Sequence, residues 1–220
     1  MPFNDTAGNV MLDALDESVT QITHAGIFTL GGGDPGQATN ATGTEATGGS
    51  PAYARQSVTW GAASGRQKSN TNSLTFDVPA GTYAYFCWFN ASTGNTNNYR
   101  GYAPFMGATP LKGFATVDPT LANDALFAPG HGLANDDRVV VYNVFAGTIA
   151  TGLTEGTVYF VVSSATNSFK LSTTSGGATV DITALGNGQV HWARVIPEVF
   201  GSQGQITVAA GQLVLDNTGI

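Results

Sequence analysis

Charged side chains are scarce in this sequence of 220 residues, where Asp, Glu, Lys and Arg together make up 10% of the chain. An average soluble protein has about a quarter. The 15 acidic and 8 basic residues give a formal net charge of -7, and the basic residues form no run. Because phosphate binding needs clustered Lys and Arg, the composition argues against a nucleic-acid partner.

Cysteine and long apolar runs are also nearly absent. The single cysteine, Cys87, has no partner for an internal disulfide, and its aromatic surroundings predict a small buried apolar side chain rather than a nucleophile. No segment approaches the roughly 20 apolar residues of a membrane span. Residues 1–5 lack the basic and apolar regions of a secretion signal. We therefore expect a chain that folds in the cytoplasm and has no membrane partner.

The residues that are abundant favour β-structure. The apolar fraction of 42% is sufficient for a packed core, and Gly occurs 29 times among many Thr, Val and Asn. These are residues of strands and tight turns, whereas long helices favour Ala, Leu, Glu, Lys and Arg. We predict a mainly β fold, with a β-sandwich or jelly-roll-like base domain and a short N-terminal helix.

The helix is predicted near the start of the chain. Asn4 or Asp5 would cap it, Val10, Met11, Ala14, Leu15 and Val19 recur at helical spacing, and it ends near Ser18. Residues 31–50 are almost all small or polar and predict an exposed loop. Alternation and β-forming residues predict strands at 21–30, 52–60, 74–78, 82–89, 205–208 and 212–215.

Two of these strands end in near copies of one phrase, VPAG at 78–81 and VAAG at 208–211. Each phrase separates two predicted strands. This local repeat suggests two similar hairpins that pair within one sandwich.

The stretch from about 113 to 195 differs in texture, because short strand patterns and turn residues follow one another at regular spacing. The predicted strands are 138–143, 157–163, 168–172, 179–182 and 189–193. We therefore predict a small β-barrel or β-sandwich domain at 111–195. It is inserted into a discontinuous base domain formed by 1–110 and 196–220.

Motifs for metal or phosphate chemistry are missing. His24, His131 and His191 lie on separate segments without zinc-ligand spacing. His131 stands between two glycines, which predicts a loop with unusual backbone angles. Asn135, Asp136 and Asp137 offer oxygens to Ca²⁺ but lack the spacing of an EF-hand, so a turn before a strand is favoured. The GGGDPG run at 31–36 has no Lys-Ser/Thr, and no helix follows it. We expect no metal and no cofactor.

Catalytic motifs are missing as well. Gly-x-Ser-x-Gly does not occur. A glycosidase needs two carboxylates held across a groove, and most of the 15 acidic residues fall at predicted turns or on the first helix, which argues against such a pair. We expect no catalytic residues and no enzyme activity. Tyr99, Tyr102, Phe105 and Trp192 are the candidate contact residues for a partner or a glycan, since aromatic faces are large and rigid. The alternative is that these four side chains pack between the two domains.

An ordered series of phrases resembles a family of small structural proteins of tailed bacteriophages. The phrases are TGGSPAYAR at 47–55, VTW at 58–60, FDVPAGT at 76–82 and FGSQG at 200–204. This resemblance covers about 1–110 and 196–220. A second series resembles a β module of phage tail, fibre and other virion surface proteins: HGL at 131–133, DRV at 137–139, TGL at 151–153, GTVYFVV at 156–162, FKLS at 169–172 and SGGA at 175–178.

Both resemblances imply a non-enzymatic virion structural protein, either a tail fibre or minor tail component or a capsid decoration protein. It would be assembled in the host cytoplasm and displayed on the particle surface. The expected partners are copies of the chain itself in a homotrimer, and major capsid or tail proteins. The base domain would assemble the protein while the inserted domain projects. The alternative is an adsorption module that binds a host receptor or a bacterial surface glycan.

Overall fold

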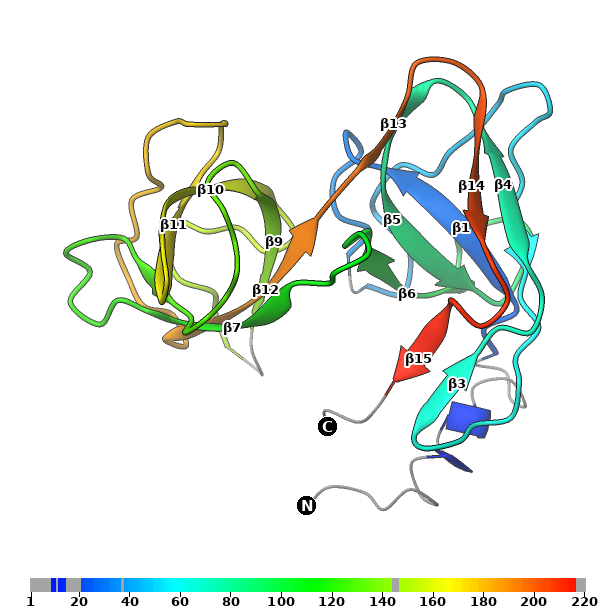
Figure 1. The fold of residues 1–220 in the computed structure, drawn as a ribbon, viewed down its shortest axis with the longest axis horizontal. Coiled ribbons are helices and arrows are strands. Elements are labelled where there is room, and N and C mark those ends of the chain that lie inside the picture. Colours follow the sequence, from blue (N-terminus) through cyan, green and yellow to red (C-terminus); the bar gives the residue numbers. More distant parts are fainter. Residues whose placement is uncertain (1–8, 11, 15–20, 37, 144–146, 217–220) are drawn as a thin grey trace. The chain divides into compact units, whose positions relative to one another are not determined.

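The computed structural model describes residues 9–10, 12–14, 21–36, 38–143 and 147–216 (Figure 1). The fold is mainly β, as the composition predicts. The chain divides into two compact units, the first formed by Met1–Ala103 and Val199–Ile220 and the second by Pro104–Glu198. No helix among the described residues is both long and apolar enough to cross a membrane.

The first unit is built around one five-stranded sheet with the order β13-β5-β1-β2, in which β6 also pairs with β5. Its strands are β1 (His24–Thr29), β2 (Gln56–Ser57), β5 (Gly81–Phe89), β6 (Tyr99–Pro104) and β13 (Glu198–Phe200). The aromatic strand β5, predicted at 82–89, is a central strand of this sheet. It pairs with β1 in antiparallel register, with Gly26 opposite Cys87, and the two strands lie side by side in Figure 1. The chain therefore leaves and re-enters this unit on strands that both pair with β5.

Two small sheets complete the first unit. They consist of β3 (Gln67–Ser69) with β15 (Val214–Asp216), and of β4 (Leu74–Val78) with β14 (Gly204–Val208). The strands that lead into the two repeated phrases, β4 and β14, pair with each other, as predicted. The second strands do not repeat this pairing, because β5 and β15 belong to different sheets. Phe76 on β4 meets Phe86 on β5 edge-on, with ring centroids 6.0 Å apart, so the two sheets are in contact at this point.

The predicted N-terminal helix is present at the described residues 9, 10 and 12–14. Its proposed caps, Asn4 and Asp5, and its predicted end near Ser18 lie outside the described residues. Asp13 accepts a hydrogen bond from Lys68 Nζ at 2.8 Å, and Asn9 accepts one from the Arg66 amide at 2.8 Å. These bonds attach the helical turn to the segment around β3.

The second unit contains a closed barrel with the order β10-β11-β8-β7-β12-β9. Of the two alternatives predicted for this segment, the barrel is therefore the one that forms. Its strands are β7 (Lys112–Val117), β8 (Leu126–Phe127), β9 (Arg138–Asn143), β10 (Val158–Ala165), β11 (Ser168–Ser172) and β12 (Gln189–Val195). The first and last strands, β7 and β12, are neighbours, which brings the two ends of the unit together.

The barrel interior is filled by alternate residues of each strand, and Leu126, Phe169 and Trp192 are among the largest. The predicted strand at 179–182 is wrong. This described segment forms an isolated bridge between Ser172 and Thr179 instead. Ile182 joins the interior cluster, so the apolar residues of the segment fill the barrel without extending its wall.

Candidate functional site

The candidate site of the first unit is built around an ion pair between Glu45 and Arg55. The guanidinium donates to the carboxylate twice, from Nε to Oε1 and from Nη2 to Oε2, at 2.7 Å in each case. The Tyr53 hydroxyl donates to Glu45 Oε1 at 3.0 Å and accepts from the Ile27 amide at 2.8 Å. The side chains of Arg55 and Glu45 are 4% and 25% exposed. A pair this well shielded is strong only if its remaining groups are also bonded.

Arg55 meets that condition. Its Nη1 donates to the carbonyl oxygens of Gly94 at 2.8 Å and Ala91 at 3.2 Å. Its Cζ lies 3.3 Å from the centroid of the Phe89 ring, and a cation over an aromatic face is stabilised by the ring quadrupole. Arg55 therefore links the segment of Glu45 and the turn after β5 to the sheet below.

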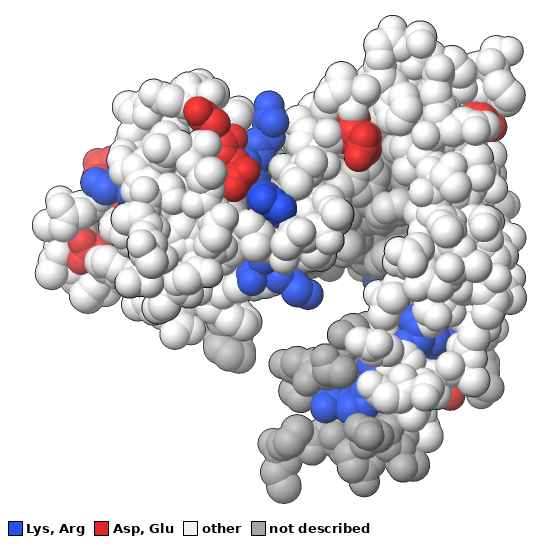
Figure 2. Space-filling model, viewed as in Figure 1, with Lys and Arg blue, Asp and Glu red and all other residues white. Residues whose placement is uncertain are grey.

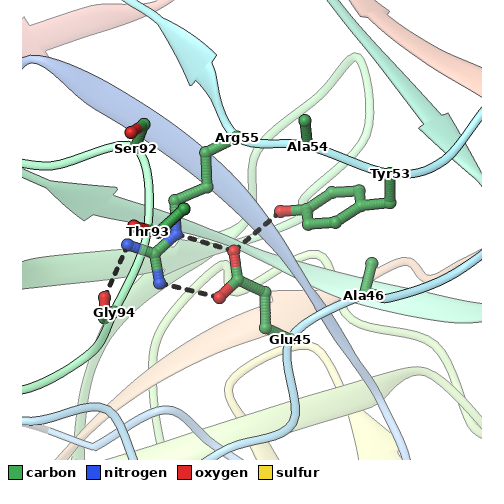
Figure 3. A pocket seen from close by; sticks show the side chains of 8 residues that line it. All are labelled: Glu45, Ala46, Tyr53, Ala54, Arg55, Ser92, Thr93 and Gly94. Carbon is green, nitrogen blue, oxygen red and sulfur yellow. Dashed lines mark hydrogen bonds and ion pairs between the residues drawn. The ribbon is translucent and has the colours of Figure 1, made fainter.

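A pocket of about 270 Å³ lies beside this ion pair, and Figure 3 shows Arg55 between the carboxylate of Glu45 and the carbonyl of Gly94. The pocket is lined by Glu45, Ala46, Tyr53, Ala54, Arg55, Ser92, Thr93 and Gly94. Its charged groups already bond each other within the protein. The pocket therefore has the chemistry of a structural site and not of a site that holds a charged substrate.

The ion pair fits because of Gly26 on β1. A Cβ atom at this position would lie 2.9 Å from Glu45 Oε1, and 3.1 Å from both the Tyr53 hydroxyl and the Phe89 ring. Gly26 thus leaves the space that the carboxylate and the two rings occupy. Sequence reasoning missed this role because a glycine within a strand pattern does not reveal which side chains approach it.

Two further residues, Asn95 in the turn after β5 and Tyr99 on β6, bond the loop at 31–50. The side-chain amide of Asn95 bonds the backbone of Ala41 twice, accepting from its N–H at 2.9 Å and donating to its C=O at 2.7 Å. The Tyr99 hydroxyl donates to the Gly36 carbonyl at 2.8 Å. The loop has exposed residues, as predicted, and these bonds attach it to the sheet at several points.

The ionisable groups around this site are poorly suited to proton transfer or nucleophilic attack. Burial, followed by the charge of Glu45, raises the pKa of Tyr53. Burial likewise raises the pKa of Tyr85 and that of Cys87, which lies opposite Gly26. These groups stay protonated at neutral pH, and a thiol is a weak nucleophile compared with a thiolate.

The four aromatic residues predicted to contact a partner or a glycan are distributed over both units. Tyr99 is buried against Phe89, with ring centroids 5.7 Å apart. Tyr102 is half-buried and meets Tyr85 edge-on at 5.9 Å. Phe105 is buried, and Trp192 lies in the barrel interior. Three of the four side chains are therefore buried, and the predicted contacts of all four with a partner or a glycan stay a prediction.

His131 is bonded through both ring nitrogens. Nε2 lies 2.7 Å from the Ala165 carbonyl, and Nδ1 accepts from the Leu133 amide at 3.0 Å. These bonds fit a neutral ring with its proton on Nε2. The flanking glycines have φ values of 63° and 70°, so the predicted loop with unusual backbone angles is confirmed.

The predicted turn before a strand at 135–137 is also confirmed, since it directly precedes β9. Asp136, with a φ of 70°, accepts from the Ser175 hydroxyl and the Gly176 amide at 2.7 and 2.9 Å. Asp137 accepts from the Ala134 amide at 2.8 Å. Within the described ranges, no three His, Cys, Asp or Glu side chains are grouped so that they could hold a metal ion.

Sequence reasoning missed the aromatic residues that do reach the surface. Phe114 on β7 is 65% exposed, and Phe127 on β8 is 43% exposed. The signal for Phe114 is the alternation in KGFATV at 112–117, where Ala115 and Val117 face inward and Phe114 shares the polar face with Lys112 and Thr116.

The structure combines a mainly β architecture in two units with an ion pair whose bonds are all within the protein. Residues 2–105, which are 104 of the 220 residues, match the model of a family described as podophage GP4 fiber I protein gp80. The match supports a structural protein of the bacteriophage virion. No curated protein and no solved structure matches the chain.

Proposed function

We propose that the chain is a non-enzymatic component of a bacteriophage particle, displayed on its surface and acting through assembly with copies of itself. The observation that carries this proposal is the match of residues 2–105 to a podophage fibre family. The matched segment supplies most of the first unit, including the Glu45–Arg55 pair and strands β1 to β5. We therefore assign assembly to the first unit and a projecting position to the barrel.

The distribution of charge supports assembly. Figure 2 shows that most of the visible face carries neither basic nor acidic residues. Burying ions in an interface requires their desolvation, so an interface formed by a surface with few charges has a low desolvation cost. A homotrimer with an obligate interface would bury more than about 2,000 Å².

Two locations on the particle fit this role, a tail fibre or minor tail position and a decoration position on the capsid. The matching family is described as a fibre protein, which favours the tail. The partners in the two cases are tail proteins or the major capsid protein.

The test is to purify the phage particles that encode this chain and to count its copies by quantitative mass spectrometry and cryo-electron microscopy. A few copies at the tail are expected for a fibre, and hundreds over the head for decoration. Light scattering on the purified protein should give three times the mass of one chain. A monomer at micromolar concentration that is absent from purified particles would contradict the proposal.

A further inference from the structure

One outer wall of the barrel has a regular arrangement of side chains. On β7, β8, β9 and β12 the inward residues fill the core, and the residues between them face outward. The strand register aligns the outward residues in rows. One row contains Phe114, His191 and Tyr142, and the neighbouring row contains Phe127, Thr116 and Gln189. We call these six residues the aromatic wall.

The rings of the first row are in contact. The His191 ring lies between the other two, with its centroid 5.1 Å from that of Phe114 and 5.8 Å from that of Tyr142. Tyr142 is 8% exposed and flanks His191 within the row, while Phe114 is 65% exposed. Phe127 lies diagonally across from Phe114, at the about 7–8 Å expected for diagonal neighbours of a sheet. The exposed rings of the wall, Phe114 and Phe127, are therefore held on paired strands and not on a loop.

Polar groups surround these rings. Thr116 and Gln189 face each other across β7 and β12, in the same row as Phe127. Lys112, also exposed, lies two residues before Phe114 on the same face of β7. The wall and Lys112 contain hydroxyl, amide and ammonium groups and no carboxylate. An uncharged or acidic ligand with many hydroxyl groups matches this set.

The size of the wall favours a small occupant. A stable protein interface uses about 20–30 residues and about 800 Å² on each side, whereas here two exposed phenylalanines stand among polar residues. A pyranose ring has one apolar face of C–H groups and a rim of hydroxyls, so it needs a flat aromatic surface with hydrogen-bonding groups at its edges. We propose that the aromatic wall binds a saccharide, with Phe114 stacking on the sugar ring and Gln189, Thr116 and Lys112 bonding its hydroxyl or acidic groups.

This inference goes beyond the proposed structural role and places saccharide recognition on residues other than the four predicted from the sequence. The probe is an array of purified bacterial O-antigen and capsular polysaccharides, followed by titration of the strongest ligand into the full-length protein. Phe114→Ala should weaken binding at least about tenfold, the effect expected from loss of one aromatic contact. Phe114→Trp should retain binding.

Phe160→Ala is the matched control. Phe160 is a half-buried aromatic residue on β10 that pairs with Arg138 and lies outside the aromatic wall. The Phe160→Ala variant should bind the saccharide with the same affinity as the unmodified protein. Equal melting temperatures of Phe114→Ala and the unmodified protein would show that the variant is folded, and Gln189→Ala provides a second variant that removes no apolar side chain.

An array without binding by the unmodified protein overturns the inference, and so does equal binding by Phe114→Ala. Phe114-dependent binding to cells stripped of polysaccharide also overturns it and assigns the wall to a protein partner. The proposed function fails separately, if the chain is absent from purified particles. Particles that carry Phe114→Ala at normal copy number but adsorb poorly would support both proposals.

Discussion

Arg55 holds Glu45 through two parallel hydrogen bonds of 2.7 Å while its guanidinium lies against the face of Phe89. The two residues belong to segments without long strands, on either side of the exposed turn at 47–52. Because these segments have little backbone pairing, the side-chain bonds of the ion pair hold them in place. The pair fixes their position relative to β1 and β5.

Removal of one member of this pair should be strongly destabilising. Arg55→Ala leaves Glu45 without its cation. We expect it to lower the free energy of unfolding by about 3 kcal/mol, at the lower end of the values for removal of one partner of a buried ion pair. Urea unfolding followed by tryptophan fluorescence measures this. Glu198→Gln, at an exposed position, is the control and should change little. Equal stability of Arg55→Ala and the unmodified protein would show that the pair contributes nothing.

Gly26→Ala tests the space beneath the pair. The added methyl group would meet Glu45, Tyr53 and Phe89 at 2.9 to 3.1 Å, and we expect a loss of about 1–3 kcal/mol from overpacking. The control is Gly31→Ala, where an added Cβ has no atom within 4 Å. Thermal unfolding should separate the two variants. A lower melting temperature for Gly31→Ala than for Gly26→Ala would refute the steric argument.

Asn70 connects the segment after β3 to the turn before β15. Its side chain, in a residue 1% exposed, accepts from the Leu213 amide at 2.8 Å and donates to the Ala209 and Asn72 carbonyls. Asn70→Ala would leave buried backbone groups without partners and should lower stability by about 2 kcal/mol. Asn98→Ala removes one side-chain bond at a more accessible position, so it should have a smaller effect. Chemical denaturation of both variants gives the comparison.

The protein should become less stable as the pH falls below neutrality. Burial, followed by the charge of Lys112, lowers the pKa of His191 from its usual 6.5. Burial and then Arg55 do the same for His24. The unfolded chain takes up protons near pH 6.5 while the folded chain does not, so stability present above that pH is lost as the pH falls through the lowered values.

The measurement is the free energy of unfolding at several pH values between 7 and 5. His191→Gln should reduce the slope of stability against pH, because the variant has no imidazole to titrate at this position. Lys112→Met should also reduce the slope, because it removes the charge that disfavours the imidazolium. A slope unchanged by both variants would contradict the assignment.

The barrel should fold without the rest of the chain. Its core residues all lie between Ala115 and Trp192, and its strands close on themselves, so no strand edge depends on the first unit. Residues 104–198 expressed alone should unfold cooperatively and give a dispersed amide NMR spectrum. Poorly dispersed amide signals would show that the barrel needs the first unit in order to fold.

Sequence patterns were sufficient where one strand carries its own signal. The alternation of Leu74, Phe76 and Val78 predicted β4 with its observed bounds, and 138–143 and 168–172 likewise match β9 and β11. Short strands such as β3 and β8 were missed, because two or three residues are too few for an alternation to be visible. The segment 179–182 was misassigned because its apolar residues have the spacing of a strand but fill the barrel interior.

The sequence by itself determined that this protein is mainly β, low in charge and free of familiar catalytic motifs, because these properties depend on composition and on local periodicity. It also contains the phrases that resemble phage structural proteins. Only the tertiary structure decided that Gly26 makes room for Glu45, and that Tyr99 and Trp192 are buried while Phe114 is exposed. Burial depends on which residues far apart in the chain pack over a side chain, and no local pattern of residues records that.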